Sequence, residues 1–196
     1  MECLFGFVGK DFVLTVADAT SIQSILVMKN TEDKSRDLNK HVLMLYSGEP
    51  GDTVQFAEYI QRNVRFYEIK NGIELSPQAA SKFTRRQLAE SMRSRKPYAV
   101  NLLIAGYDVK TESGRLYWID YLGSLVELPF AAHGYGMFFV MSLFDRYYYP
   151  QIPLDEAKVL VKKCIDELKT RFLVNMANFK VKISNKDGIQ EIKLDE

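Results

Sequence analysis

Two histidines and two cysteines are the residues from which this chain would have to build a metal site or a nucleophilic centre. His41 and His133 each stand alone, because neither has a cysteine or a second histidine at the spacing of metal ligands. A Ser-His-Asp triad would need one of the same histidines, and the sequence has neither a Gly-x-Ser-x-Gly elbow nor a phosphate-binding P-loop. We therefore expect no metal site, no cofactor and no triad.

A Gly-x-Gly sequence, Gly134-Tyr135-Gly136, follows His133 and precedes a long apolar run. Backbone N–H groups at such a turn could bind an anion. A tight turn with a hydrogen-bonded histidine accounts for the same residues. We expect the turn, with anion binding as the alternative.

Basic residues gather near the end of a predicted helix over residues 76–92, where they could contact phosphate or an acidic partner. A helix C-terminus also favours cations, so we prefer the interpretation of a solvated face. The chain has 26 basic and 25 acidic residues, which argues against a nucleic-acid-binding protein. The basic residues are Arg85, Arg86, Arg93, Arg95 and Lys96.

The length of 196 residues predicts one domain, spanning 1–196. Two cysteines, Cys3 and Cys164, cannot form a disulfide framework and suit a reduced compartment. The N-terminal residues lack the basic and apolar segments of a signal peptide. The most apolar stretch, residues 137–144, is far shorter than the roughly 20 residues of a membrane span. We expect a soluble protein of the cytoplasm and nucleus.

The apolar patterns predict strands, two helices, strands, two helices and strands again. This order is not the βαβ alternation of a parallel sheet. Two antiparallel sheets with a helix pair outside each would bury every apolar face, which predicts an α+β fold. The predicted strands are 4–8, 12–17, 25–28, 42–46, 98–107, 116–121, 125–128, 179–184 and 189–194, and the predicted helices are 52–71, 76–92, 136–148 and 154–172.

Local signals refine these elements. Asp52 and Gln55 have the spacing of a capping box, and Val54 opens the apolar face of that helix. Residues 136–148 are apolar almost all round, which predicts a buried helix. Asp187-Gly188 is a favoured pair for a type I′ hairpin turn.

Several segments, taken together and in order, resemble the beta-type subunits of the 20S proteasome. The resemblance covers nearly the whole chain, and it looks strongest to the type that occupies the fourth position of the beta ring. It rests on residues 12–18, the loop of Lys34, and residues 47–56, 98–108, 117–123, 133–136 and 186–189, with 51–60, 74–77 and 93–98 pointing to the fourth position.

The resemblance implies a four-layer αββα sandwich of the N-terminal nucleophile hydrolase type. Active members of this family use an N-terminal threonine freed at a Gly-Thr bond, with an aspartate and a lysine that tune it. Asp18 and Lys34 keep the family's spacing of 16, but counting back 16 from Asp18 reaches Glu2, and no Gly-Thr dipeptide occurs. Gly48 matches the glycine that supplies an oxyanion-hole N–H. We expect Asp18, Lys34 and Gly48 to be a vestigial framework without catalytic residues or a propeptide, in which Lys34 pairs with Asp18.

Cys3 is the rival nucleophile, in an alternative in which the chain is an active N-terminal threonine- or cysteine-type hydrolase. Cys3 lies 15 residues before Asp18, and odd and even offsets along a strand point to opposite faces. We therefore expect its thiol to face away from Asp18 and Lys34.

The expected function is that of a non-catalytic structural subunit of the 20S core particle, in the beta ring that encloses the chamber for ubiquitin-dependent protein degradation. The resemblance implies beta type-3 and beta type-5 subunits as ring neighbours, alpha-ring subunits on one side and the opposite beta ring on the other, with no nucleic acid and no membrane as partners. Arg146, Tyr147, Tyr148 and Tyr149 are the candidate interface residues, because interfaces favour aromatics and arginine. The alternative is that these tyrosines cap the chain's own core.

Overall fold

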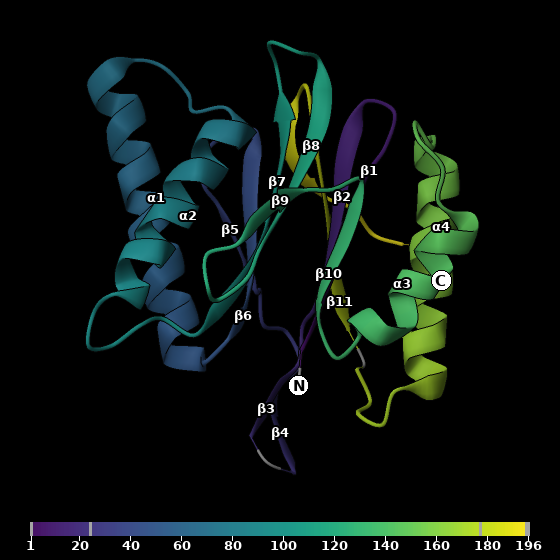
Figure 1. Cartoon of the computed structure of the whole chain (residues 1–196). Helices are drawn as coiled ribbons and strands as arrows, with labels where there is room; N and C mark the ends of the chain where they lie inside the picture. The colour runs from purple at the N-terminus through teal and green to yellow at the C-terminus, as the bar shows by residue number, and fades with distance from the viewer. Residues whose placement is uncertain (1, 24, 177, 195–196) are drawn as a thin grey trace.

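Two five-stranded antiparallel sheets lie face to face, and a pair of helices covers the outer face of each sheet (Figure 1). The computed structural model describes residues 2–23, 25–176 and 178–194. The four layers confirm the predicted α+β architecture of the αββα type. Within the described ranges, no helix is long and apolar enough to cross a membrane.

The first sheet combines the two ends of the chain. Its strand order is β10-β1-β2-β11-β12, so the hairpin of β1 and β2 lies in the middle of the sheet. Helices α3 and α4 pack on its outer face, where Phe5, Phe7 and Phe144 are fully buried. The bounds are β1 Cys3–Val8, β2 Phe12–Asp18, β10 Phe130–Gly134, β11 Phe179–Asn185, β12 Gly188–Glu191, α3 Met137–Tyr147 and α4 Leu154–Arg171.

The second sheet is built from one continuous stretch of sequence. Its order is β5-β6-β7-β8-β9, and α1 and α2 cover its outer face over Phe56, Ile60 and Leu88. The bounds are β5 Ser35–Asp37, β6 Val42–Gly48, β7 Val100–Asp108, β8 Ser113–Ile119, β9 Leu125–Glu127, α1 Pro50–Asn71 and α2 Pro77–Met92.

A third apolar layer joins the sheets to each other. Leu4 and Val13 of the first sheet meet Leu43, Leu45 and Leu103 of the second, all nearly or fully buried. Strands with a helix pair on one face and a sheet on the other have no polar face to show. This is why all seven residues of β2 are buried.

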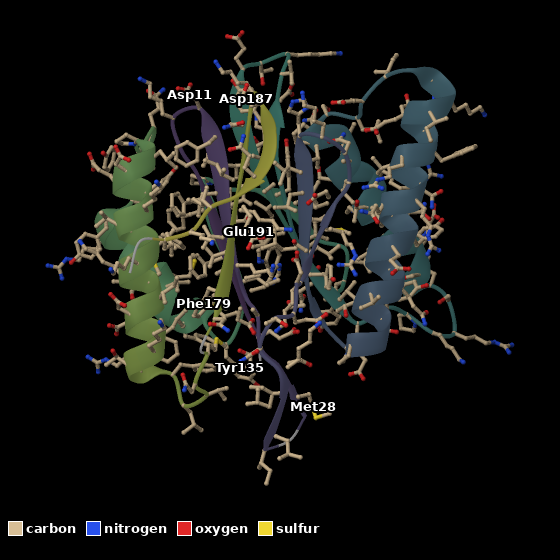
Figure 2. All side chains as sticks on the ribbon, turned by 180° about the vertical axis from the view of Figure 1, so that it is seen from behind. Asp11, Met28, Tyr135, Phe179, Asp187 and Glu191 are labelled. Carbon is tan, nitrogen blue, oxygen red and sulfur yellow. The ribbon has the colours of Figure 1, made fainter. Side chains whose placement is uncertain are left out.

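A two-stranded ribbon stands outside both sheets. Among the strands of the described residues, β3, Ser21–Gln23, and β4, Leu26–Lys29, pair only with each other, and they project from one end of the sandwich (Figure 1). Met28 lies at that end, whereas Asp11 and Asp187, in the two hairpin turns of the first sheet, lie at the opposite end (Figure 2). The sequence predicted a strand over 25–28 but not its exposure, since each residue from Ile25 to Met28 is at least 60% exposed.

The predicted start of α1 was wrong. The helix begins at Pro50 after Glu49, whose side chain makes no capping hydrogen bond. The Asp52 carboxylate accepts a hydrogen bond from the backbone N–H of Ala99 instead of closing a capping box. Val54 is exposed, and the buried face runs through Phe56 and Ile60. The predicted end of the first helix at residue 71 and the predicted start of the second at residue 76 are confirmed. Gly72 follows the end of α1 with φ 65°, and the Ser76 side chain caps α2 by accepting the N–H of Ala79.

Three other local predictions need correction. Strand β10 was missed, so His133 lies in a strand rather than a turn. Helix α3 is not buried all round, because Phe138 is 72% exposed. The loop of the last hairpin is Lys186-Asp187, neither of which has a positive φ, so the turn is not of type I′.

Candidate functional site

The predicted Asp18–Lys34 pair is confirmed. Asp18 ends β2 and is fully buried, and Lys34 is only 6% exposed. Lys34 Nζ lies 2.7 Å from Asp18 Oδ2 and donates a second hydrogen bond to the carbonyl of Thr20 at 2.9 Å. Asp18 Oδ1 accepts the N–H of Cys3 at 2.8 Å. The pair is therefore hydrogen-bonded on both sides, as buried charges must be.

Glu2 brings a second carboxylate to the same lysine. Its Oε1 lies 3.5 Å from Lys34 Nζ, and its Oε2 accepts the N–H of Gly48 at 2.8 Å. Gly48 has φ 136°, and a Cβ there would overlap the carbonyl oxygen of Ala99, so only glycine fits. The structure thus brings Asp18, Lys34 and Gly48 together, and it places the Glu2 carboxylate where Lys34 and Gly48 meet.

Cys3 is fully buried in the core under α3 and α4, whereas the next residue of β1, Leu4, faces the second sheet. A Cβ on Gly136 would overlap the Sγ of Cys3, so that glycine lets the helix approach the thiol closely. Burial, and after it the charge of Asp18, raises the pKa of the Cys3 thiol far above its ordinary value, with Lys34 acting weakly in the opposite sense. The thiol is therefore protonated at neutral pH.

The two histidines are held by other groups. The His133 ring stacks on Trp118 with centroids 4.8 Å apart, and its Nε2 lies 3.1 Å from the carbonyl oxygen of Leu102. Burial lowers the pKa of His133 to about 4. His41 Nδ1 lies 3.0 Å from a Glu74 carboxylate oxygen. Among the residues that the structure describes, no three His, Cys, Asp or Glu side chains gather as a metal would need.

The glycines after His133 serve close packing. A Cβ on Gly134, which has φ 81°, would overlap the carbonyl oxygen of Glu2. Gly136 meets Cys3 in the same way. Both glycines are thus required where the chain crosses the start of β1, and this close packing accounts for the Gly-x-Gly sequence.

The basic residues at the end of α2 are partly engaged on the surface. Arg85 Nε donates to the carbonyl of Gly123 at 3.0 Å, and Arg86 pairs with Glu90 one turn along the helix at 2.9 Å. Arg93, Arg95 and Lys96 are exposed, in agreement with a solvated face.

The candidate interface residues divide into two kinds. The Tyr148 ring packs against Phe7 and Phe130, and its hydroxyl donates to the carbonyl of Val8 at 3.0 Å, so Tyr148 caps the chain's own core. Tyr147 and Tyr149 are 38% and 42% exposed. Lys163 Nζ and Arg146 lie over the Tyr147 ring, 4.0 and 5.3 Å from its centroid. The interface prediction stays open for Arg146, Tyr147 and Tyr149.

Two features near the N-terminus and the β3–β4 ribbon could not be predicted from the sequence. Counting back from Asp18 identified Glu2, but nothing in that spacing shows that its carboxylate reaches Gly48. The apolar run from Ile25 to Met28 was visible, but an exposed apolar strand has the same sequence pattern as a buried one.

Comparison with known proteins gives consistent results along the whole chain. Residues 2–184 match the family described as "Proteasome subunit". "Probable proteasome subunit beta type-4" of Schizosaccharomyces pombe is 48% identical over 99% of this chain and 100% of its own length. "Proteasome subunit beta type-4" of Saccharomyces cerevisiae is 47% identical over 98% of this chain and 97% of its own length. "Proteasome subunit beta type-2-B" of Arabidopsis thaliana is 48% identical over 97% of this chain and 95% of its own length.

Proposed function

The chain belongs to the proteasome subunit family, among its beta-type members, and from that premise we propose that it is a non-catalytic subunit of the beta ring. Its task is to close the ring that encloses the proteolytic chamber. Fold and family membership alone do not decide catalysis, which depends on the residues of the site.

One observation carries the proposal: counted by the family's spacing from Asp18, Glu2 falls where active members have their nucleophile, and its carboxylate lies beside Lys34 and Gly48. An N-terminal nucleophile must present a hydroxyl or thiol beside a base, and its own α-amine serves as that base. The Glu2 side chain offers a carboxylate, and its nitrogen is tied in a peptide bond to Met1. The carboxylate also accepts the N–H of Gly48, the group expected to stabilise an oxyanion.

The alternative of a cysteine hydrolase is less well supported. Cys3 would become terminal only if Met1 and Glu2 were removed. Its thiol is fully buried beneath α3 and α4, and burial raises its pKa, so neither access nor a thiolate is provided.

The proteasome family implies assembly with other proteasome subunits. We propose beta type-3 and beta type-5 subunits as ring neighbours, alpha-ring subunits and the opposite beta ring as further partners, and the cytoplasm and nucleus as the location. Large exposed apolar side chains on several elements support such contacts, since they would be covered in a ring. They include Ile25, Phe66, Ile69, Phe138, Val159 and Leu173.

A covalent probe tests the lack of catalysis directly. Assembled particles are treated with a peptide epoxyketone and a peptide vinyl sulfone, and each subunit is weighed by mass spectrometry. We expect adducts on other beta subunits, which serve as the internal control, and none on this chain. An adduct on Cys3 or on any newly exposed N-terminal residue would favour the hydrolase.

A further inference from the structure

Two groups that can bind an anion, a backbone N–H and an ammonium, converge at the point where β1 begins and β6 ends. The N–H of Gly48 donates to one oxygen of Glu2 at 2.8 Å. Lys34 Nζ lies 3.5 Å from the other oxygen. Both oxygens of a single carboxylate are thus engaged by groups that come from elsewhere in the chain.

The N–H of Gly48 is fixed in orientation by its neighbours. Gly48 pairs with Val100 in the sheet, and the next residue, Glu49, donates its N–H to the carbonyl of Ala99 at 3.0 Å. The φ of 136° holds the peptide in a conformation that residues with a Cβ rarely adopt. A donor that is already oriented binds an acceptor without a further ordering cost.

The Lys34 ammonium contacts two carboxylates, of which only one is fully buried. Lys34 pairs most closely with Asp18, at 2.7 Å, on its buried side. Glu2 approaches from the other side, where its side chain is 27% exposed. A small solute could therefore reach this side if the Glu2 side chain were absent.

We propose that Lys34 and Gly48 form a carboxylate-binding site that the chain's own Glu2 fills, and that this contact fastens the start of β1 to the end of β6. The two strands belong to different sheets, which also meet through the apolar side chains of Leu4 and Leu45 and through the contact of His133 with the carbonyl oxygen of Leu102. The site would accept a small free carboxylate, such as formate, when the Glu2 side chain is removed. The inference is separate from the proposed function, because it concerns what the site binds and not whether the subunit cleaves peptides.

Hydrogen exchange at the Gly48 amide tests the proposal in the assembled particle. Particles carrying Glu2→Ala are compared with the unsubstituted particle in buffers that contain either chloride or formate at equal ionic strength. In chloride, exchange at Gly48 should be at least about ten-fold faster in Glu2→Ala, because a hydrogen bond to a charged group is lost. In formate, the rate should return toward that of the unsubstituted particle.

Two controls separate the site from general effects. Glu49→Ala removes a neighbouring carboxylate that makes no capping hydrogen bond, and it should leave exchange at Gly48 unchanged in both buffers. Glu2→Gln keeps the side-chain volume and an acceptor oxygen but loses the charge, so it carries the test if Glu2→Ala does not assemble. Its Gly48 amide should exchange several-fold faster than in the unsubstituted particle.

Either of two results would overturn the proposal. Unchanged exchange in Glu2→Ala, or in Glu2→Gln where that variant is used, would mean that Glu2 does not hold the Gly48 amide. Equal exchange of Glu2→Ala in formate and in chloride would mean that the site does not select carboxylates.

Discussion

At the scale of single residues, burial decides what the loss of Lys34 would cost. Asp18 is fully buried, and its closest ionic partner is the Lys34 ammonium. Removing one member of a buried pair leaves an uncompensated charge in the interior. An exposed pair such as Lys29 with Glu32 is solvated and should matter little.

We predict that Lys34→Ala destabilises the subunit by about 3–5 kcal/mol and lowers particle yield, while the peptide cleavage of those particles that form is unchanged. Denaturant unfolding of the subunit and activity per assembled particle are the measurements. Lys29→Ala is the matched control and should change stability by less than about 1 kcal/mol. Normal stability with lost peptide cleavage would contradict the prediction.

His133 gives the subunit a dependence on pH that can be assigned to one side chain. Burial lowers its pKa from the ordinary 6.5 to about 4 in the folded chain, so the unfolded chain binds the proton first as pH falls. The contribution of His133 to the free energy of unfolding is fully present above pH 6.5 and is lost progressively as pH falls to about 4. The total loss is on the order of 3 kcal/mol.

We predict that His133→Gln removes the part of the pH dependence of the unfolding free energy that His133 causes. Unfolding free energies of both proteins are measured from neutral to acidic pH, and their difference should change mainly between pH 6.5 and 4. Parallel curves through this range would show that His133 titrates normally in the folded chain.

At the scale of elements, the β3–β4 ribbon is the most unusual feature. It pairs with no other strand among the described residues, and Leu26, Val27 and Met28 are all 60% exposed or more. An isolated two-stranded ribbon is marginally stable in water. Its apolar side chains are therefore expected to be covered by another subunit in the assembled ring.

We predict that Leu26→Ser with Met28→Ser reduces particle yield on native gels with little change in the unfolding midpoint of the isolated chain. Exposed changes usually cost under about 0.5 kcal/mol each, whereas interface hot spots are worth about 2 kcal/mol or more. Lys29→Ser, on the same strand, is the control. A sharp fall in the midpoint would assign the ribbon to the fold of the subunit itself.

The end of α3 gives a second test of interface against core. We predict that Tyr148→Ser destabilises the isolated chain by about 2 kcal/mol or more, because it empties space beside Phe7 and Phe130. Tyr147→Ser with Tyr149→Ser should leave the unfolding midpoint nearly unchanged and lower particle yield. Equal midpoints for the two proteins would contradict this division of roles.

Element types were predictable from the sequence where the apolar period was clear, and boundaries were not. Ser76 caps α2 and Gly72 ends α1 through contacts with residues nearby in the chain. The start of α2 and the end of α1 could therefore be predicted. The capping box at Asp52 failed because its carboxylate bonds Ala99, a residue 47 positions away. Strand β10 was missed because its residues gain their extended conformation from pairing with β1.

At the scale of the whole molecule, the order of the layers could be predicted from the order of the elements along the chain. Two helix pairs can each bury an apolar face only if each pair covers the outer face of its own sheet. The candidate site was predictable only in part. The spacing of 16 identified Asp18 and Lys34, and their pairing followed from the cost of burying either alone. The contact of Glu2 with Gly48 joins two sheets, and no local pattern encodes such a contact.

The distribution of strands between the sheets has a consequence for synthesis on the ribosome. The second sheet with its helices uses only residues 35–127, so it can fold as soon as that stretch has emerged. In the first sheet, β2 pairs with β11, more than 160 residues later, so the earliest strands made must wait for the last. Until then, β1 and β2 expose apolar side chains on both faces and are open to aggregation.

Pulse-labelling hydrogen exchange during refolding would reveal this order. Amides of β6 and β7 should become protected before those of β1, β2 and β11, because closure of the long loop is slow. Simultaneous protection of both sheets would show that they form together. The nascent chain would therefore need shielding at its oldest residues rather than at its newest.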